Sequence, residues 1–143
     1  MADYVYFTDV TWKKEHWGEI KMGNGPIMDF SAPPDAHGHA GVLTPEDAFV
    51  GAVNTCIMMM FIWACKRFKI NLISYTCHGE GIKNIALDRT ETFIRVILEP
   101  KIVVNGTRIK TVERALKAAR KYSLVGNSIT SDLIIKPEII LEE

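Results

Sequence analysis

The chain has 143 residues, enough for one ordinary domain with a core of its own, so we expect a single domain over residues 1–143. Lys plus Arg and Asp plus Glu both number 17, which leaves no net charge to attract nucleic acid or an anionic membrane. Three scattered cysteines, Cys56, Cys65 and Cys77, are too few and odd in number for a disulfide framework.

The N-terminal part of the chain predicts a small β-structure. Its first ten residues, MADYVYFTDV, lack the basic and then apolar pattern of a signal peptide, so we expect a cytoplasmic protein. Residues 4–12 alternate weakly and are rich in aromatic and β-branched types, which predicts a strand, and residues 16–22 are its expected hairpin partner. A Gly-Asn-Gly-Pro turn at 23–26 precedes a short third strand at 27–30.

A loop dense in Pro, Gly and Asp follows over residues 31–43. It contains His37 and His39 close to Asp35, a grouping that resembles part of a metal site. A zinc site needs three or four ligands in firm geometry, and no companion Cys or His pair stands nearby. We therefore expect solvent-exposed loop histidines and neither a metal nor a cofactor.

Residues 44–67 predict a long helix around which the rest of the chain is organised. Thr44 suits the N-cap position, acidic residues follow it, and Lys66 and Arg67 complement the dipole at the other end. Between them no charged residue occurs from Ala48 to Cys65, and opposite helical faces are both apolar. A helix of this kind is buried on all sides, in protein or in lipid.

The choice between protein and lipid rests on the rest of the sequence. The run of about 18 uncharged residues reaches the lower limit for spanning a bilayer. It contains Gly51, Asn54 and Thr55, however, and no second long apolar stretch exists. We therefore expect no membrane span, and a helix covered by a sheet, by other helices or by a partner subunit. Asn54, if buried, requires a hydrogen-bond partner.

Beyond this helix the pattern returns to strands. The runs 70–81 and 92–104 are β-rich, and Pro100 predicts an edge position or a bulge in the second of them. Residues 109–122 predict an amphipathic second helix, and residues 129–141 a final strand. The order β-β-β-α-β-β-α-β predicts an α+β fold in which an antiparallel sheet packs around the long central helix.

Two segments carry a resemblance to a known family. The first is the Thr-Pro-Glu helix start at 44–46 with a cysteine ten residues after the glutamate, and the second is Tyr-Ser-Leu-Val-Gly-Asn-Ser at 122–128. Together they resemble the OsmC/Ohr family of osmotically inducible and organic hydroperoxide resistance proteins. The resemblance implies a thiol-dependent peroxidase of the oxidative stress response. It also implies an intertwined homodimer whose central helices pack back to back.

The family site consists of an attacking cysteine, a second cysteine after the second helix, and an N-terminal arginine held by a glutamate. By resemblance, Cys56 takes the place of the attacking cysteine and Glu46 that of the glutamate. The position of the second cysteine holds Ser123, and no arginine precedes Arg67. The arginine is therefore missing unless a lysine substitutes for it, the candidates being Lys13, Lys14 and Lys21.

These departures leave more than one function open. Ser123 cannot form a disulfide, so a peroxidase would work through Cys56 alone and pass its sulfenic acid to an external thiol reductant. Alternatively Cys56 is an inert core thiol, as we expect for Cys65 and Cys77, and the protein is an inactive dimer that binds a small hydrophobic ligand or another protein. Apolar side chains that would line a ligand pocket, or an adaptable core or dimer interface, are Trp12, Trp17, Trp63 and the methionines at 58–60.

Overall fold

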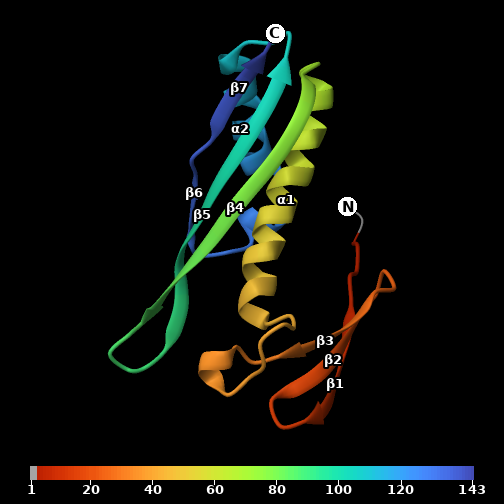
Figure 1. Ribbon diagram of the computed structural model, residues 1–143, viewed down its shortest axis with the longest axis vertical. Coiled ribbons are helices and arrows are strands. Elements are labelled where there is room, and N and C mark those ends of the chain that lie inside the picture. Colours follow the sequence, from red (N-terminus) through yellow and green to blue (C-terminus); the bar gives the residue numbers. More distant parts are fainter. Residues whose placement is uncertain (1–2) are drawn as a thin grey trace. The chain divides into compact units, whose positions relative to one another are not determined.

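The computed structural model describes residues 3–143, which form two compact units that meet within one helix, α1 (Pro45–Arg67). The first unit ends at Phe49 and the second runs from Val50 to Glu143. Figure 1 shows the strands and helices of each unit. The mixed α+β class predicted from the sequence is confirmed, and the predicted order holds except for an additional short helix and a last strand that is divided in two.

The first unit is an antiparallel sheet of three strands, β1 (Thr8–Lys14), β2 (Trp17–Met22) and β3 (Ile27–Ser31). Strand β1 begins four residues later than its predicted start, and β2 and β3 lie within one residue of prediction. Gly25 makes the second turn with a φ of 118°, a value that L side chains rarely adopt. The following loop holds only a short 3₁₀ turn, η1 (Pro34–Ala36).

Helix α1 has the predicted start and end. The hydroxyl of Thr44 accepts a hydrogen bond from the backbone N–H of Asp47 at 3.1 Å, which caps the N-terminus. Lys69 then leaves the helix with a positive φ of 58°. By length and composition alone α1 could cross a membrane, but a core helix passes the same test.

Only one face of α1 is buried within the single chain. That face is built from residues three or four apart, the spacing of one helical stripe: Val53, Ile57, Phe61, Ala64 and Cys65. The neighbouring face, with Ala52, Thr55 and Met59, is exposed, and the Met59 side chain retains 57% of its accessible surface. We expected α1 to be buried on all sides, and this single chain buries only one of its faces.

The second unit contains a four-stranded sheet centred on β5 (Glu91–Asn105). Strand β4 (Asn71–Ile85) pairs with β5 as an antiparallel hairpin, and its turn lies where the sequence predicts one. The predicted last strand is divided into β6 (Asp132–Ile135) and β7 (Glu138–Glu142), both parallel to β5. The sheet is therefore mixed and not purely antiparallel. Helix α2 (Ile109–Tyr122) returns the chain along β5, so the strands that follow run in the direction of β5.

Pro100 lies neither at an edge nor in a bulge. It sits in the central strand opposite Cys77, and the irregularities of the hairpin fall at residues 72–74 and 82–83. In a strand, the backbone groups of residues i and i+2 point toward the same neighbouring strand. The Leu98 carbonyl accepts a hydrogen bond from Lys136 N–H, so the backbone groups of Leu98 and Pro100 both point toward the β6 side of β5. The nitrogen of Pro100 therefore faces the interruption between β6 and β7, where Pro137 follows Lys136. Its missing N–H costs no ladder hydrogen bond there.

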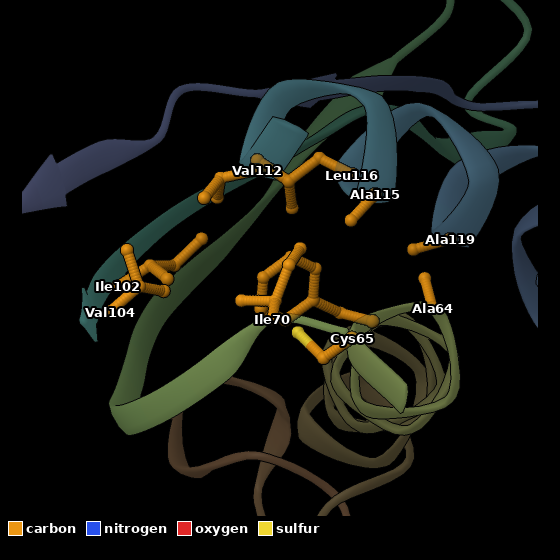
Figure 2. Packing of buried hydrophobic residues seen from close by; sticks show 10 residues of the cluster. Ala64, Cys65, Ile70, Ile102, Val104, Val112, Ala115, Leu116 and Ala119 are labelled. Atoms are coloured by element: carbon orange, nitrogen blue, oxygen red, sulfur yellow. The ribbon is translucent and has the colours of Figure 1, made fainter. Parts of the chain in front are cut away.

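The core of the second unit lies between α1, β5 and α2 (Figure 2). Alternate residues of β5 are fully buried toward the helices: Val96, Leu98, Pro100, Ile102 and Val104. Helix α2 occupies the predicted residues and adds its apolar stripe, Val112, Ala115, Leu116 and Ala119. The short helix α3 (Leu124–Asn127) follows at once, so that residue 123 lies at the junction between two helices.

Candidate active site

The structure brings together Cys56, in the middle of α1, and Ser123, at the junction between α2 and α3. The Ser123 hydroxyl donates a hydrogen bond to Cys56 Sγ at an Oγ–Sγ distance of 3.1 Å. Ser123 is fully buried, and Cys56 is half-buried. Two residues 67 positions apart in the sequence are thus in direct contact, as the two segments of the predicted site require.

Local backbone structure fixes the Ser123 side chain. Ser123 ends α2 and is the N-cap of α3, where its Oγ accepts the backbone N–H of Gly126 at 3.0 Å. A side chain at position 126 would begin 3.0 Å from that oxygen, so a glycine leaves room for the contact. With Oγ accepting from Gly126, the single hydroxyl proton is directed at sulfur.

This arrangement has a chemical consequence. A hydroxyl that donates to sulfur stabilises negative charge on it, which is the form in which a cysteine attacks an electrophile. Gly126 was not predicted as a site residue. The sequence signal that would have indicated Gly126 is its position three residues after Ser123, because an N-cap serine accepts a hydrogen bond from the backbone N–H at that position.

The other predicted members of the site are less complete. Glu46 is exposed in the first turn of α1 and makes no ion pair in the part of the chain that the structure describes. Of the lysines considered as a substitute for arginine, Lys13 is engaged by Asp29 at 2.7 Å and Glu19 at 3.7 Å. These carboxylates, with the Asp29 hydrogen bond as the largest cause, raise the pKa of Lys13. Across residues 3–143 no Lys or Arg side chain donates to Cys56 Sγ.

The two remaining cysteines differ from each other in burial. Cys65 is 3% exposed in the core, and burial raises the pKa of its thiol to about 11, as expected for an inert core cysteine. Cys77 is half-buried on β4 and not in the core, so the expectation of a core cysteine was wrong there; burial also raises the pKa of its thiol. Its carbonyl accepts from the side-chain amide of Asn54 at 3.2 Å, which confirms that Asn54 has the partner it was expected to need.

The loop histidines lie within the first unit. The His39 ring packs edge-on against Trp17 with centroids 4.5 Å apart, and its Nε2 is 3.8 Å from a Glu15 carboxylate oxygen. The His37 ring lies 6.1 Å from that of His16. Within residues 3–143 no three His, Cys, Asp or Glu side chains are grouped as metal ligands.

The aromatic and methionine side chains considered for a pocket are divided between the units. Trp12 and Trp17 belong to β1 and β2. In the second unit, Met60 and Trp63 line a groove of about 810 Å³ that starts one helical turn beyond Cys56. The cations that share this groove were not singled out from the sequence.

The structure is thus that of an α+β protein with a cysteine on its long central helix and a hydrogen-bond donor from the end of the second helix. The sequence model of the OsmC-like protein family matches residues 38–138, which is more than half of the chain and includes both Cys56 and Ser123. This chain therefore belongs to the OsmC family, as the resemblance of its two segments indicated.

Relatives are similar over nearly their whole length. The uncharacterised protein YmaD of Bacillus subtilis is 21% identical over 96% of this chain and 95% of its own. An OsmC-like protein of unknown function from Vibrio cholerae superposes with a TM-score of 0.88 at 21% identity, covering 95% of this chain and 100% of its own. An organic hydroperoxide resistance protein from Legionella pneumophila superposes with a TM-score of 0.73 at 16% identity, over 98% and 99%. At these identities the structures show a shared fold.

Proposed function

We propose that this OsmC-family protein is a thiol-dependent peroxidase that reduces organic hydroperoxides through Cys56 alone. The observation that carries the proposal is the hydrogen bond from Ser123 Oγ to Cys56 Sγ at 3.1 Å. Cys56 is also only half-buried, unlike the core thiol Cys65. The family membership and the fold shared with a hydroperoxide resistance protein support the choice of substrate class.

The proposed cycle uses one cysteine of the protein. The Cys56 thiolate attacks the outer peroxide oxygen, the O–O bond breaks, and the leaving alkoxide takes up a proton to give an alcohol. Cys56 is left as a sulfenic acid. An external thiol then condenses with it, releasing water and forming a mixed disulfide. A second external thiol attacks that disulfide, which restores Cys56 and releases the oxidised reductant as a disulfide.

The experiment is to treat the reduced protein with cumene hydroperoxide and to trap sulfenic acid with dimedone, followed by mass mapping. We expect the adduct on Cys56 and none on Cys65. Ser123→Ala should slow adduct formation about 10- to 100-fold, because one hydrogen bond to charged sulfur is lost. Cys77→Ala is the matched control and should react at the wild-type rate. If Cys56 stays a thiol while a known peroxidase is oxidised in parallel, the proposal is wrong.

One observation favours a second candidate, an inactive relative that binds a small hydrophobic ligand or another protein. The sequence has no arginine before Arg67, and no Lys or Arg donates to Cys56 in the part of the chain described. A thiol without a cation has weaker stabilisation of its charged form. Absence of the dimedone adduct, together with a retained apolar molecule in native mass spectra of protein from cells, would support this candidate.

A further inference from the structure

A groove in the second unit lies between the last turns of α1 and the last turns of α2. Its volume is about 810 Å³, within the range of roughly 300–1,000 Å³ typical of small-molecule sites. One wall is apolar and comes mainly from Met60, Trp63 and Phe68. The opposite side carries Lys117 and Lys121 of α2.

The apolar wall is accessible and contains ordered aromatic contacts. Trp63 retains 40% of its accessible surface, and its ring packs edge-on against that of Tyr122 with centroids 5.7 Å apart. Met60 and Phe68 are each partly buried against the core cluster. A flat or linear apolar group of a ligand would therefore pack on side chains that the protein core and the Tyr122 ring already hold in position.

The charged side of the groove has cations without carboxylate partners. Arg67, Lys117 and Lys121 all line it, and none makes an ion pair within residues 3–143. Aromatic rings hold two of them: the Arg67 guanidinium lies 5.7 Å from the centre of the Trp63 ring, and Lys121 Nζ lies 5.2 Å from that of Tyr122. Helix α2 contains a single acidic residue, Glu113, which does not line the groove.

We propose that this groove binds a small organic acid, a carboxylate attached to an apolar body such as a medium-length alkyl chain. Lys117, Lys121 and Arg67 would receive the carboxylate through charge-assisted hydrogen bonds, and Met60, Trp63 and Phe68 would cover the apolar body. The combination of three cations that lack carboxylate partners with an apolar wall favours an anion that is apolar elsewhere over a neutral hydrophobic ligand. The site does not depend on reaction at Cys56.

The test is a titration with decanoate and, separately, with decanol, followed by tryptophan fluorescence and isothermal titration calorimetry. The two probes share an apolar chain and differ in charge. We expect saturable binding of decanoate, with decanol bound at least about tenfold more weakly. Trp63→Phe should remove most of the fluorescence change while calorimetry still detects binding, which assigns the signal to this groove and not to Trp12 or Trp17.

Paired charge variants complete the experiment. The double substitution Lys117→Gln/Lys121→Gln should raise the dissociation constant for decanoate by about tenfold or more and leave that for decanol unchanged. The matched control, Lys101→Gln/Lys110→Gln, removes two exposed lysines outside the groove and should bind decanoate as the wild type does. Equal affinity for the two probes, no effect of the groove variant, or no saturable decanoate binding overturns the proposal. None of these measurements involves peroxide, so they are independent of the proposed peroxidase.

Discussion

The hydroxyl of Ser123 has one proton and two partners, and the direction of that proton defines the chemistry open to Cys56. Because Gly126 N–H already donates to Oγ, the proton is available to sulfur. A serine here supplies a hydrogen-bond donor where the family resemblance places a second cysteine. The same position that would complete a two-cysteine cycle in a relative therefore places a hydroxyl donor against the Cys56 sulfur in this chain.

We predict that Ser123→Cys converts this contact into a disulfide with Cys56 under mild oxidation. Position 123 already places its side-chain oxygen 3.1 Å from Cys56 Sγ, and a disulfide requires the two sulfurs to approach to about 2.05 Å. Mass mapping of the peptides under non-reducing conditions measures the bridge. Ser128→Cys, an exposed serine at the end of α3, is the control and should give no bridge to Cys56. Failure of the first variant to cross-link would mean that the two segments do not adopt the described contact.

At the scale of elements, the packing of α1 against α2 buries a thiol that has no counter-charge. Cys65 lies in the cluster formed by both helices and β5 (Figure 2), and burial alone raises the pKa of its thiol to about 11, against an ordinary value of 9.0. The unfolded chain loses the Cys65 thiol proton at a lower pH than the folded chain does. The contribution of the protonated Cys65 thiol to the free energy of unfolding is therefore complete below pH 9. It is lost as the pH rises from about 9 to about 11.

We therefore predict that the free energy of unfolding falls between pH 8 and pH 10.5, and that Cys65→Ala removes about 2 kcal/mol of that fall. Urea unfolding followed by circular dichroism at both pH values measures it. Val112→Ala is the control, because it also truncates the core but has no titrating group. It should lower stability at both pH values and keep the wild-type pH dependence. An unchanged dependence in Cys65→Ala would contradict the burial argument.

Most elements of this fold follow from local sequence signals. Thr44 marks the start of α1, and Asn105-Gly106 separates β5 from α2, with Gly106 at a φ of 67°. The orientation of the last strands could not be predicted in the same way, because it depends on where α2 returns the chain to β5. Pro100 was misplaced for a related reason. Its tolerance in the central strand depends on an interruption in a neighbour that lies more than 30 residues later.

In the candidate site, too, some features could be predicted from the sequence and others depend on the tertiary structure. Cys56 and the position of Ser123 could be assigned from two short segments, because a family resemblance compares positions directly. The gathering of Arg67 with Lys117 and Lys121 could not, because it depends on the packing of α1 against α2. The sequence itself shows only that α2 is rich in Lys and Arg and that α1 carries no charge from Ala48 to Cys65.

For the whole molecule, the outer face of α1 is the main unexplained surface. Ala52, Thr55 and Met59 lie along one stripe that the chain leaves exposed. Cys65 and Phe61, on the opposite side of the same helix, are buried. Exposed apolar stripes on an uncharged helix indicate an interface with protein or lipid. Four residues beyond Met59 the stripe continues to Trp63, which is 40% exposed and also lines the groove.

We predict that a second copy of the chain covers this stripe, so that the protein is a homodimer in solution. Light scattering should give twice the mass of one chain. Met59→Glu should shift the equilibrium to monomer, because dimerisation would then bury two carboxylates at facing positions. Leu87→Glu makes the same change at a fully exposed turn residue and should leave the dimer intact. A monomeric wild type would contradict the prediction. If Met59→Glu becomes monomeric and still binds decanoate, the groove is complete within one chain.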